Sequence, residues 1–149
     1  MTSRTELALE LKRFIKAPPE AVYAAWTDSN HLKQWFGPVG VKTNDLVAEA
    51  RVGGIFRWDI TDPEGDKMTM LGEFRELLPA RKVVFTWHWQ EDEAWENQIS
   101  LVTVELTPCD GGTNLRLIHE QLPNARSRQG HTEGWTSALD KLDQFVSSR

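Results

Sequence analysis

The chain of 149 residues contains one cysteine, Cys109, and one tyrosine, Tyr23. A lone cysteine excludes an internal disulfide framework and a metal centre built from several cysteines. It fits a reducing environment, and we expect a cytoplasmic protein. No apolar run approaches the roughly 18–20 residues that span a bilayer, and the N-terminal segment lacks the hydrophobic core of a signal peptide. We therefore expect no membrane contact.

Positive charge is also scarce, with 17 basic against 22 acidic residues and a net charge of −5. This balance argues against a protein that binds nucleic acid electrostatically, and the densest basic pair is only Arg126 and Arg128. No glycine-rich phosphate-binding motif is present, because Gly53-Gly54 stands in neither of the known spacings. We expect neither a nucleic-acid partner nor a bound cofactor.

Tryptophan, in contrast, is abundant, and the chain has seven of these residues. Each buries a large apolar area and carries one N–H group that needs an acceptor. Two interpretations stay open, a tryptophan-rich core or an aromatic wall around a flat or apolar ligand. The residues are Trp26, Trp35, Trp58, Trp87, Trp89, Trp95 and Trp135.

Alternating apolar residues predict a chain of short strands. The first runs to about Ile15, and two short helices follow, the first from Pro19 to Trp26 and the second ending at Gly37-Pro38. Strand follows strand at a spacing that favours an antiparallel meander. The six later strands are predicted at Val47–Val52, Ile55–Ile60, Met68–Leu77, Lys82–Trp89, Ser100–Leu106 and Thr113–Gln121.

The last part of the chain predicts one long helix that is buried on one face. Its apolar stripe has helical spacing and consists of His131, Trp135, Ala138, Leu139, Leu142, Phe145 and Val146. Gly134 lies inside this helix, where it costs roughly 1 kcal/mol relative to alanine. Close packing against the sheet, or space for a ligand, would explain why a glycine is tolerated there.

The ordered set of motifs resembles the Bet v 1-like, START-related superfamily with the helix-grip fold. More narrowly, it resembles the family named for the C-terminal domain of the activator of Hsp90 ATPase. The resemblance covers the whole chain, in order, through Ala17-Pro18-Pro19-Glu20-Ala21-Val22-Tyr23-Ala24-Ala25-Trp26-Thr27, Trp35-Phe36-Gly37-Pro38, Arg51-Val52-Gly53-Gly54, Gly72, Leu78-Pro79, Phe85-Thr86-Trp87, Thr113, His119-Glu120 and Gly134-Trp135.

The resemblance implies one α+β domain over residues 1–149, with the order β-α-α-β6-α. A curved antiparallel sheet would grip the C-terminal helix around an internal apolar cavity. Strand and helix parity then assign the residues that would bind a ligand there. They are Phe56, Trp58, Phe85, Trp87, His119, His131, Trp135 and Leu139. Trp35 and Phe36, from the short helices, would close one end of the cavity.

Two histidines are the main polar residues among these. His119 shares a strand face with Leu115 and Leu117, so we expect it to point inward. It is either a neutral core histidine bonded to backbone or to a tryptophan N–H, or a polar anchor for a ligand. His131 lies one helical turn before Trp135 and shares its face. A metal site would need a third ligand, so none is expected.

Three functions stay open at this stage. The first is non-catalytic binding of a small apolar or aromatic molecule with one polar group near His119 or His131. The second is a protein-binding module that contacts a chaperone, as the family name implies. The third is a cyclase- or aromatase-like enzyme with a pocket histidine as base. A homodimer is a further possibility. Trp95, within the acidic loop Gln90–Asn97, belongs to a solvated loop or, if exposed, to a lid or partner contact.

Overall fold

The computed structural model describes residues 7–147. It contains seven strands and three α-helices, with one short 3-10 turn between strands. In chain order these are β1 (Leu9–Ile15), α1 (Pro19–Thr27), α2 (Ser29–Trp35), β2 (Lys42–Ala48), β3 (Ile55–Thr61), β4 (Lys67–Leu78), β5 (Lys82–Trp89), η2 (Glu93–Trp95), β6 (Ser100–Cys109), β7 (Gly112–Glu120) and α3 (Ala125–Ser147).

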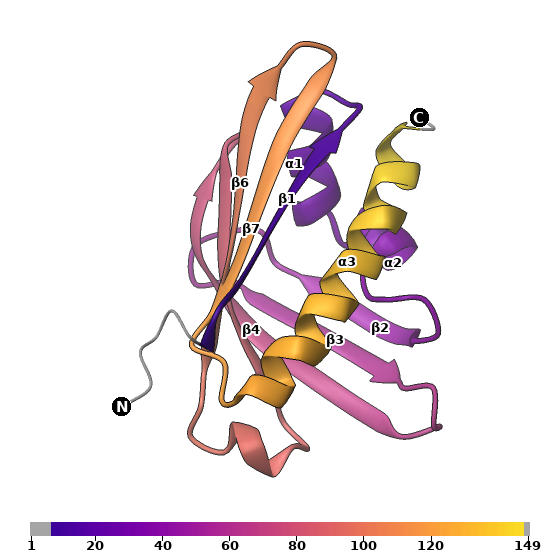
Figure 1. Ribbon diagram of the computed structural model, residues 1–149, viewed down its shortest axis with the longest axis vertical. Helices are drawn as coiled ribbons and strands as arrows, with labels where there is room; N and C mark the ends of the chain where they lie inside the picture. Colours follow the sequence, from indigo (N-terminus) through magenta and orange to yellow (C-terminus); the bar gives the residue numbers. More distant parts are fainter. Residues whose placement is uncertain (1–6, 148–149) are drawn as a thin grey trace.

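The strands form a single antiparallel sheet with the order β1-β7-β6-β5-β4-β3-β2. Consecutive strands are neighbours except at the end, where β1 pairs with β7. This pairing places Leu9 opposite His119 and Ile15 opposite Thr113. The sheet bends so strongly that β2 and β3 run across the direction of β6 and β7 (Figure 1). The α+β helix-grip arrangement predicted from the motifs is thereby confirmed.

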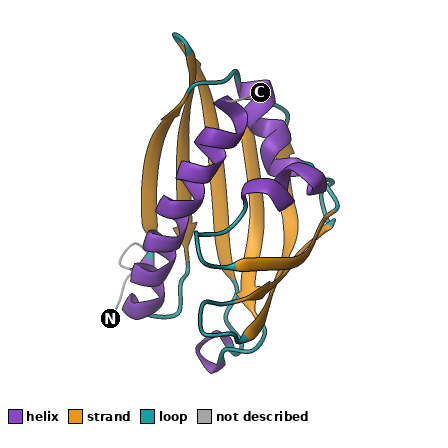
Figure 2. Ribbon diagram, turned by 90° about the vertical axis from the view of Figure 1, so that its right-hand side faces the viewer, coloured by secondary structure: helices purple, strands orange, loops and turns teal. Residues whose placement is uncertain are grey.

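The long helix α3 crosses the concave face of this sheet (Figure 1). Helices α1 and α2 lie beside its C-terminal half, as the turned view shows (Figure 2), and both contact α3 directly. The concave side is therefore covered by three helices at one end and by the N-terminal half of α3 alone at the other.

The short helices begin where the sequence predicts them. Pro19 occupies the first turn of α1, where a missing N–H costs nothing. The Oδ1 atom of Asp28 caps α2 by accepting hydrogen bonds from the backbone N–H groups of Asn30 and His31, at 2.8 and 3.3 Å. Helix α2 ends at Trp35, Phe36 is its C-cap residue, and Gly37 follows with a φ of 89°.

On β3 and β7, strand parity correctly predicts which face is buried. Phe56, Trp58 and Ile60 of β3 point into the core, whereas Asp59 between them is only half-buried and bonds to Thr69 on the next strand. On β7, His119 is fully buried, as expected from its position after Leu115 and Leu117. The alternation is thus sufficient to orient the sheet toward α3.

The strand predicted at Val47–Val52 is wrong in its position. The observed strand β2 spans Lys42–Ala48, and the chain turns after Ala48, with the Arg51 N–H bonded to the Glu49 carbonyl at 2.7 Å. Leu46 is the one buried residue of β2, and the pairing of β2 with β3 shifts register between Thr43 and Asp45. The alternation that marks a strand in sequence is therefore absent.

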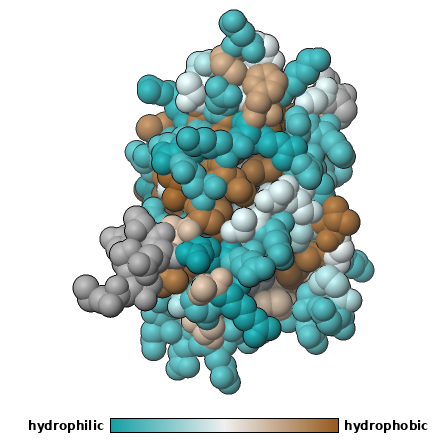
Figure 3. Space-filling view, viewed as in Figure 1, coloured by the Kyte–Doolittle hydropathy of each residue, from teal (hydrophilic) through white to brown (hydrophobic). Residues whose placement is uncertain are grey.

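The outer surface is largely polar. In the view of Figure 3, hydrophilic residues cover most of the molecule, and apolar side chains gather in the middle of this face and along its right-hand side. Among the described residues, no helix has both the length and the apolar character needed to cross a membrane.

Candidate functional site

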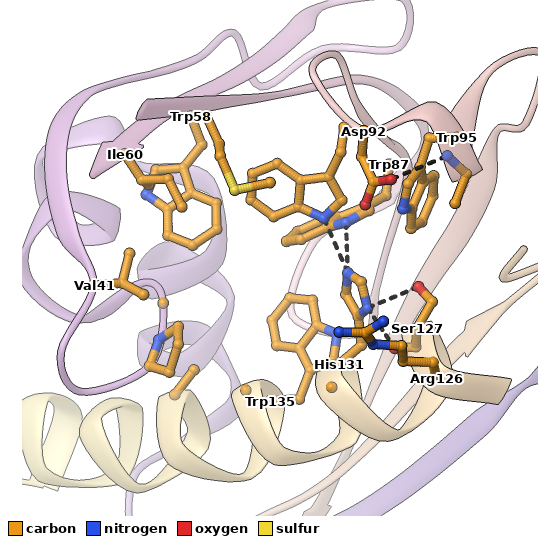
Figure 4. A pocket seen from close by; sticks show the side chains of 18 of the residues that line it. Val41, Trp58, Ile60, Trp87, Asp92, Trp95, Arg126, Ser127, His131 and Trp135 are labelled. Carbon is orange, nitrogen blue, oxygen red and sulfur yellow. Dashed lines mark hydrogen bonds between the residues drawn. The ribbon is translucent and has the colours of Figure 1, made fainter. Parts of the chain in front are cut away.

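A pocket of about 600 Å³ lies between the N-terminal half of α3 and the concave face of the sheet (Figure 4). Its wall combines aromatic side chains from the sheet with small residues from the helix. The lining residues are Phe36, Gly37, Pro38, Val41, Trp58, Ile60, Met68, Trp87, Trp89, Asp92, Ala94, Trp95, Asn124, Arg126, Ser127, Gly130, His131, Gly134, Trp135 and Ala138.

The sheet side of the pocket comes from the same ends of two strands. Trp58 and Ile60 line it from β3, and Trp87 and Trp89 line it from β5. The preceding inward-facing residues of these strands, Phe56 and Phe85, do not line it. They are fully buried and pack against each other at a ring-centroid distance of 4.8 Å. The pocket therefore begins one step further along each strand than the filled core.

On the helix side of the pocket, a stripe of small residues lies beside His131 and Trp135. Gly130, Gly134 and Ala138 are spaced four apart, so they share one stripe of α3, and all of them face the pocket. A Cβ atom on Gly134 would meet nothing closer than Pro38 Cγ at 3.9 Å, and one on Gly130 would meet nothing within 4 Å. These glycines leave open space next to the helix, so close helix–sheet packing does not explain them.

The loop between β5 and β6 covers one side of the pocket. Its turn η2 carries Trp95, which is only 1% exposed and lines the pocket, so Trp95 is not an exposed loop residue. The Trp95 ring lies 5.6 Å from the His131 ring, measured between centroids. The neighbouring Asp92 and, from the start of α3, Arg126 are exposed and lie at the solvent side of the lining (Figure 4).

The opposite side of the pocket is closed by the segment after α2. Gly37 packs so tightly on Trp58 that a Cβ atom would come within 2.4 Å of the indole, so both residues require each other. The Lys141 ammonium of α3 donates to the Gly37 carbonyl at 3.0 Å, and partial burial lowers the pKa of Lys141. The Val39 N–H donates to Ser137 Oγ at 2.9 Å. These two hydrogen bonds hold the segment after α2 against α3.

His131 lies in the pocket wall with both ring nitrogens engaged. Its Nδ1 is 2.7 Å from the Ser127 carbonyl oxygen, which can only accept, so Nδ1 carries the proton. Its Nε2 then accepts the indole N–H groups of Trp87 and Trp89, at 3.2 and 3.0 Å. Burial lowers the pKa of His131, against smaller opposing effects of the Ser127 hydrogen bond and the Asp92 charge.

His119 is bonded equally completely, behind the pocket wall. Its Nδ1 accepts the Trp135 indole N–H at 3.1 Å, and its Nε2 lies 2.7 Å from Ser100 Oγ. The Ser100 hydroxyl donates onward to the Trp87 carbonyl at 2.8 Å, so Nε2 must be the protonated nitrogen. Burial, and secondly the charge of His131, place the pKa of His119 well below its usual range. His119 is therefore the neutral core histidine of the first interpretation.

These bonds restrict the chemistry available. A histidine base needs a free lone pair within reach of the substrate. His119 does not line the pocket, and the His131 lone pair already receives two donors. Among residues 7–147, no group of three or more histidine, cysteine, aspartate or glutamate side chains is placed to hold a metal ion. The hydrogen bonds thus leave neither histidine a free lone pair for a bound molecule.

The structure divides the ligand-binding residues predicted from the sequence into two groups. Those that line the pocket are Phe36, Trp58, Trp87, His131 and Trp135. Those that are buried outside it are Trp35, Phe56, Phe85, His119 and Leu139. Trp35, for example, donates its indole N–H to the Ala25 carbonyl at 2.9 Å within the filled core.

Sequence reasoning also omitted lining residues that carried a signal. Ile60 and Trp89 have the same parity as the predicted Trp58 and Trp87, and Gly130 precedes Gly134 by one helical turn. Other lining residues come from loops, where no periodicity reports a direction. Asp92 and Asn124 are of this kind, whereas Met68 lies in β4 with the same parity as the buried Met70.

The fold defines the class of protein, an α+β helix-grip domain in which a bent sheet holds a C-terminal helix. The chain belongs to the family described as activator of Hsp90 ATPase homolog 1-like protein, whose model matches residues 16–147. No curated protein sequence matches it.

Solved structures agree with this assignment. The chain is 31% identical to the AHSA1 protein from Silicibacter pomeroyi, with a TM-score of 0.83 and coverage of 94% of this chain and 97% of that one. A protein from Chromobacterium violaceum is 28% identical, with a TM-score of 0.85 and coverage of 94% and 96%. A protein from Nitrosomonas europaea is 25% identical, with a TM-score of 0.82 and coverage of 98% and 97%.

Proposed function

We propose that this protein binds a small, flat, apolar or aromatic molecule in the pocket beneath the N-terminal half of α3. The observation that carries the proposal is the lining itself. A space of about 600 Å³ bordered by Phe36, Trp58, Trp87, Trp89 and Trp135 has the size and composition of small-molecule sites. Flat ligands suit such a wall because aromatic rings stack on one another.

The stripe of small residues on α3 supports the same proposal. Two glycines inside a helix weaken it by roughly 1 kcal/mol each relative to alanine. Gly130 and Gly134 have no close neighbour that would exclude a methyl group. Their contribution is volume next to Trp135, and a ligand is the simplest occupant of that volume.

The other functions considered from the sequence receive less support. A histidine base is disfavoured by the hydrogen bonds of His119 and His131. A chaperone-binding module calls for one contiguous exposed apolar surface. Among the described residues, the large exposed apolar side chains lie in several segments: Val47, Val52 and Ile55 are at or beside the β2–β3 connection, and Phe14 is on β1 at the opposite edge of the sheet.

Binding is tested by titrating the protein with fluorene and following tryptophan fluorescence, together with native mass spectrometry of freshly purified protein. We expect fluorescence to change with saturation, and a retained small molecule to be released on denaturation. Gly134→Leu places a side chain in the pocket and should abolish saturation. Glu133→Leu, at the adjacent exposed position of α3, is the matched control and should bind as the wild type does. Saturation that survives Gly134→Leu would refute the proposed site.

A further inference from the structure

Two indole N–H groups in the pocket wall share a single acceptor. Trp87 Nε1 and Trp89 Nε1 lie 3.2 and 3.0 Å from His131 Nε2 (Figure 4). Because His131 Nδ1 carries the ring proton toward the Ser127 carbonyl, Nε2 has the one in-plane lone pair of the ring. One lone pair cannot accept two well-aligned hydrogen bonds at full strength. One of the two donors is therefore only partly satisfied.

The other indoles with hydrogen bonds in the described chain do not share. Trp58 donates to Thr43 Oγ1 at 3.0 Å, Trp135 to His119 Nδ1 at 3.1 Å, and Trp35 to the Ala25 carbonyl at 2.9 Å. Each of these acceptors receives one indole. The shared acceptor coincides with the pocket, because Trp87, Trp89 and His131 all line it.

We propose that the pocket selects flat apolar molecules that carry one hydrogen-bond acceptor, such as an aromatic ketone, and binds that acceptor with the N–H of Trp87 or Trp89. The inference rests on the proposed function and names its ligand class. One indole turns its N–H to the ligand and the other keeps His131 bonded, so no buried polar group loses its partner. A ligand that presents a donor instead finds the Nε2 lone pair already occupied.

Polar groups at the solvent side of the lining do not alter this selection. Asp92 and Arg126 are exposed, so water competes for their hydrogen bonds. One Asp92 carboxylate oxygen also accepts the Ala94 backbone N–H at 3.0 Å. Discrimination between acceptor and donor should therefore come from the buried wall, where an unmatched polar atom is costly.

Three rigid tricyclic probes of nearly equal shape test the inference. Fluorene has no polar atom, 9-fluorenone adds an acceptor, and carbazole adds a donor at the same place. Isothermal titration of the wild type should give 9-fluorenone a dissociation constant about three- to tenfold below that of fluorene, the effect of one net hydrogen bond. Carbazole should bind no more tightly than fluorene.

A matched pair of variants identifies the donor. Trp89→Phe removes one of the two indoles that share His131, so the Trp87 N–H becomes the one indole donor to Nε2. Because no spare donor then remains for a ligand, the preference for 9-fluorenone over fluorene should fall to about onefold. Trp35→Phe removes an indole that is buried outside the pocket and whose acceptor is not shared, and should keep the preference. Near-ultraviolet circular dichroism establishes that both variants are folded.

The indole N–H resonances of the wild type provide a readout that needs no variant. Relative to fluorene, 9-fluorenone should shift the Trp87 or Trp89 resonance and leave that of Trp58 in place. Equal affinities for the three probes, or a preference for carbazole, would refute the selection of acceptor-bearing ligands but would leave the proposed binding in the pocket intact. Failure of all three to bind the wild type would instead remove the proposed function together with it.

Discussion

The two halves of α3 cover different interiors. In the C-terminal half, Leu139, Leu142 and Val146 are at most 5% exposed and pack on a core filled by α1 and α2. In the N-terminal half, Gly130 and Gly134 leave open space, so the pocket wall there is formed by Trp135 and His131 of α3 together with the tryptophans of the sheet. The same helix therefore closes the core at one end and roofs a pocket at the other. The two ends differ because Gly130 and Gly134 carry no side chain, whereas Leu139, Leu142 and Val146 fill the space below them.

The sheet repeats this division. Each inward-facing row begins in the filled half, with Phe56 on β3 and Phe85 on β5, and continues into the pocket half with Trp58 and Trp87. Trp26 of α1 contacts Phe85 at a centroid distance of 6.4 Å and Trp35 at 4.8 Å. Short helices at one end only are thus sufficient to leave the other end hollow.

The largest expected contrast is between equal truncations in the two halves. Leu142→Ala should lower the free energy of unfolding by about 3–5 kcal/mol, because Leu142 is fully buried in the filled half. Ile60→Ala should cost only about 2 kcal/mol, because Ile60 borders the pocket and lacks packing partners on that side. Urea denaturation of the two variants measures both values. Equal losses would contradict the division into a filled and a hollow half.

A smaller effect is expected from pH, because the histidines of the pocket half are held neutral. Burial lowers the pKa of His119 and of His131 in the folded protein, whereas an unfolded histidine titrates near about 6.5. As the pH falls below that value, protons bind first to the unfolded state. The free energy of unfolding should therefore be level above about pH 7 and fall below it, by at most roughly 1.4 kcal/mol per pH unit and histidine.

Denaturation between pH 7.5 and 5.5, above the range where most carboxylates titrate, measures this loss. His119→Gln retains an amide donor and acceptor but no titrating group, so its profile should be flatter than that of the wild type. A wild-type profile that rises toward acid pH would show that the histidines gain protons on folding, contrary to their hydrogen bonds with indole donors.

The smallest expected effect is a gain. Gly134→Ala should raise the free energy of unfolding by up to about 1 kcal/mol, because alanine favours the helix and its Cβ meets only Pro38, at an ordinary contact distance of 3.9 Å. Gly130→Ala is the companion variant, with nothing within 4 Å of its Cβ. Thermal unfolding of both is the measurement. Destabilisation would mean that the glycines serve close packing and that the space beside them is not open.

The sequence predicts the fold far better than the extent of the pocket. Period-two and helical spacing identify inward faces, so Trp58, Trp87 and Trp135 were correctly expected to point toward one another. Strand parity does not indicate how far along a strand the filled core extends. It therefore predicts Phe56 and Phe85 as pocket residues together with Trp58 and Trp87, although both phenylalanines are buried in the core. The position of β2 cannot be predicted from alternation, because its register shifts between Thr43 and Asp45 and only Leu46 is buried.

The hydrogen-bond partners and protonated ring nitrogens of His119 and His131 could not be predicted from the sequence either. That His119 is buried followed from its neighbours, but its bonds to Trp135 and Ser100 depend on three elements meeting in space. For His131, the deciding contact is local, since the Ser127 carbonyl lies one helical turn earlier and fixes the ring proton on Nδ1. The two indole donors come from β5, which no spacing in α3 could indicate.

The space beneath the N-terminal half of α3 is open and apolar in this structure. A crystal structure determined under xenon pressure tests this openness most directly, because xenon enters apolar cavities that lack a competing polar group. We expect a bound xenon atom between Trp58, Trp135 and Gly134, and no xenon beside Leu142 in the filled half. If side chains fill that space in the crystal and no xenon binds there, the protein has no open pocket beneath α3.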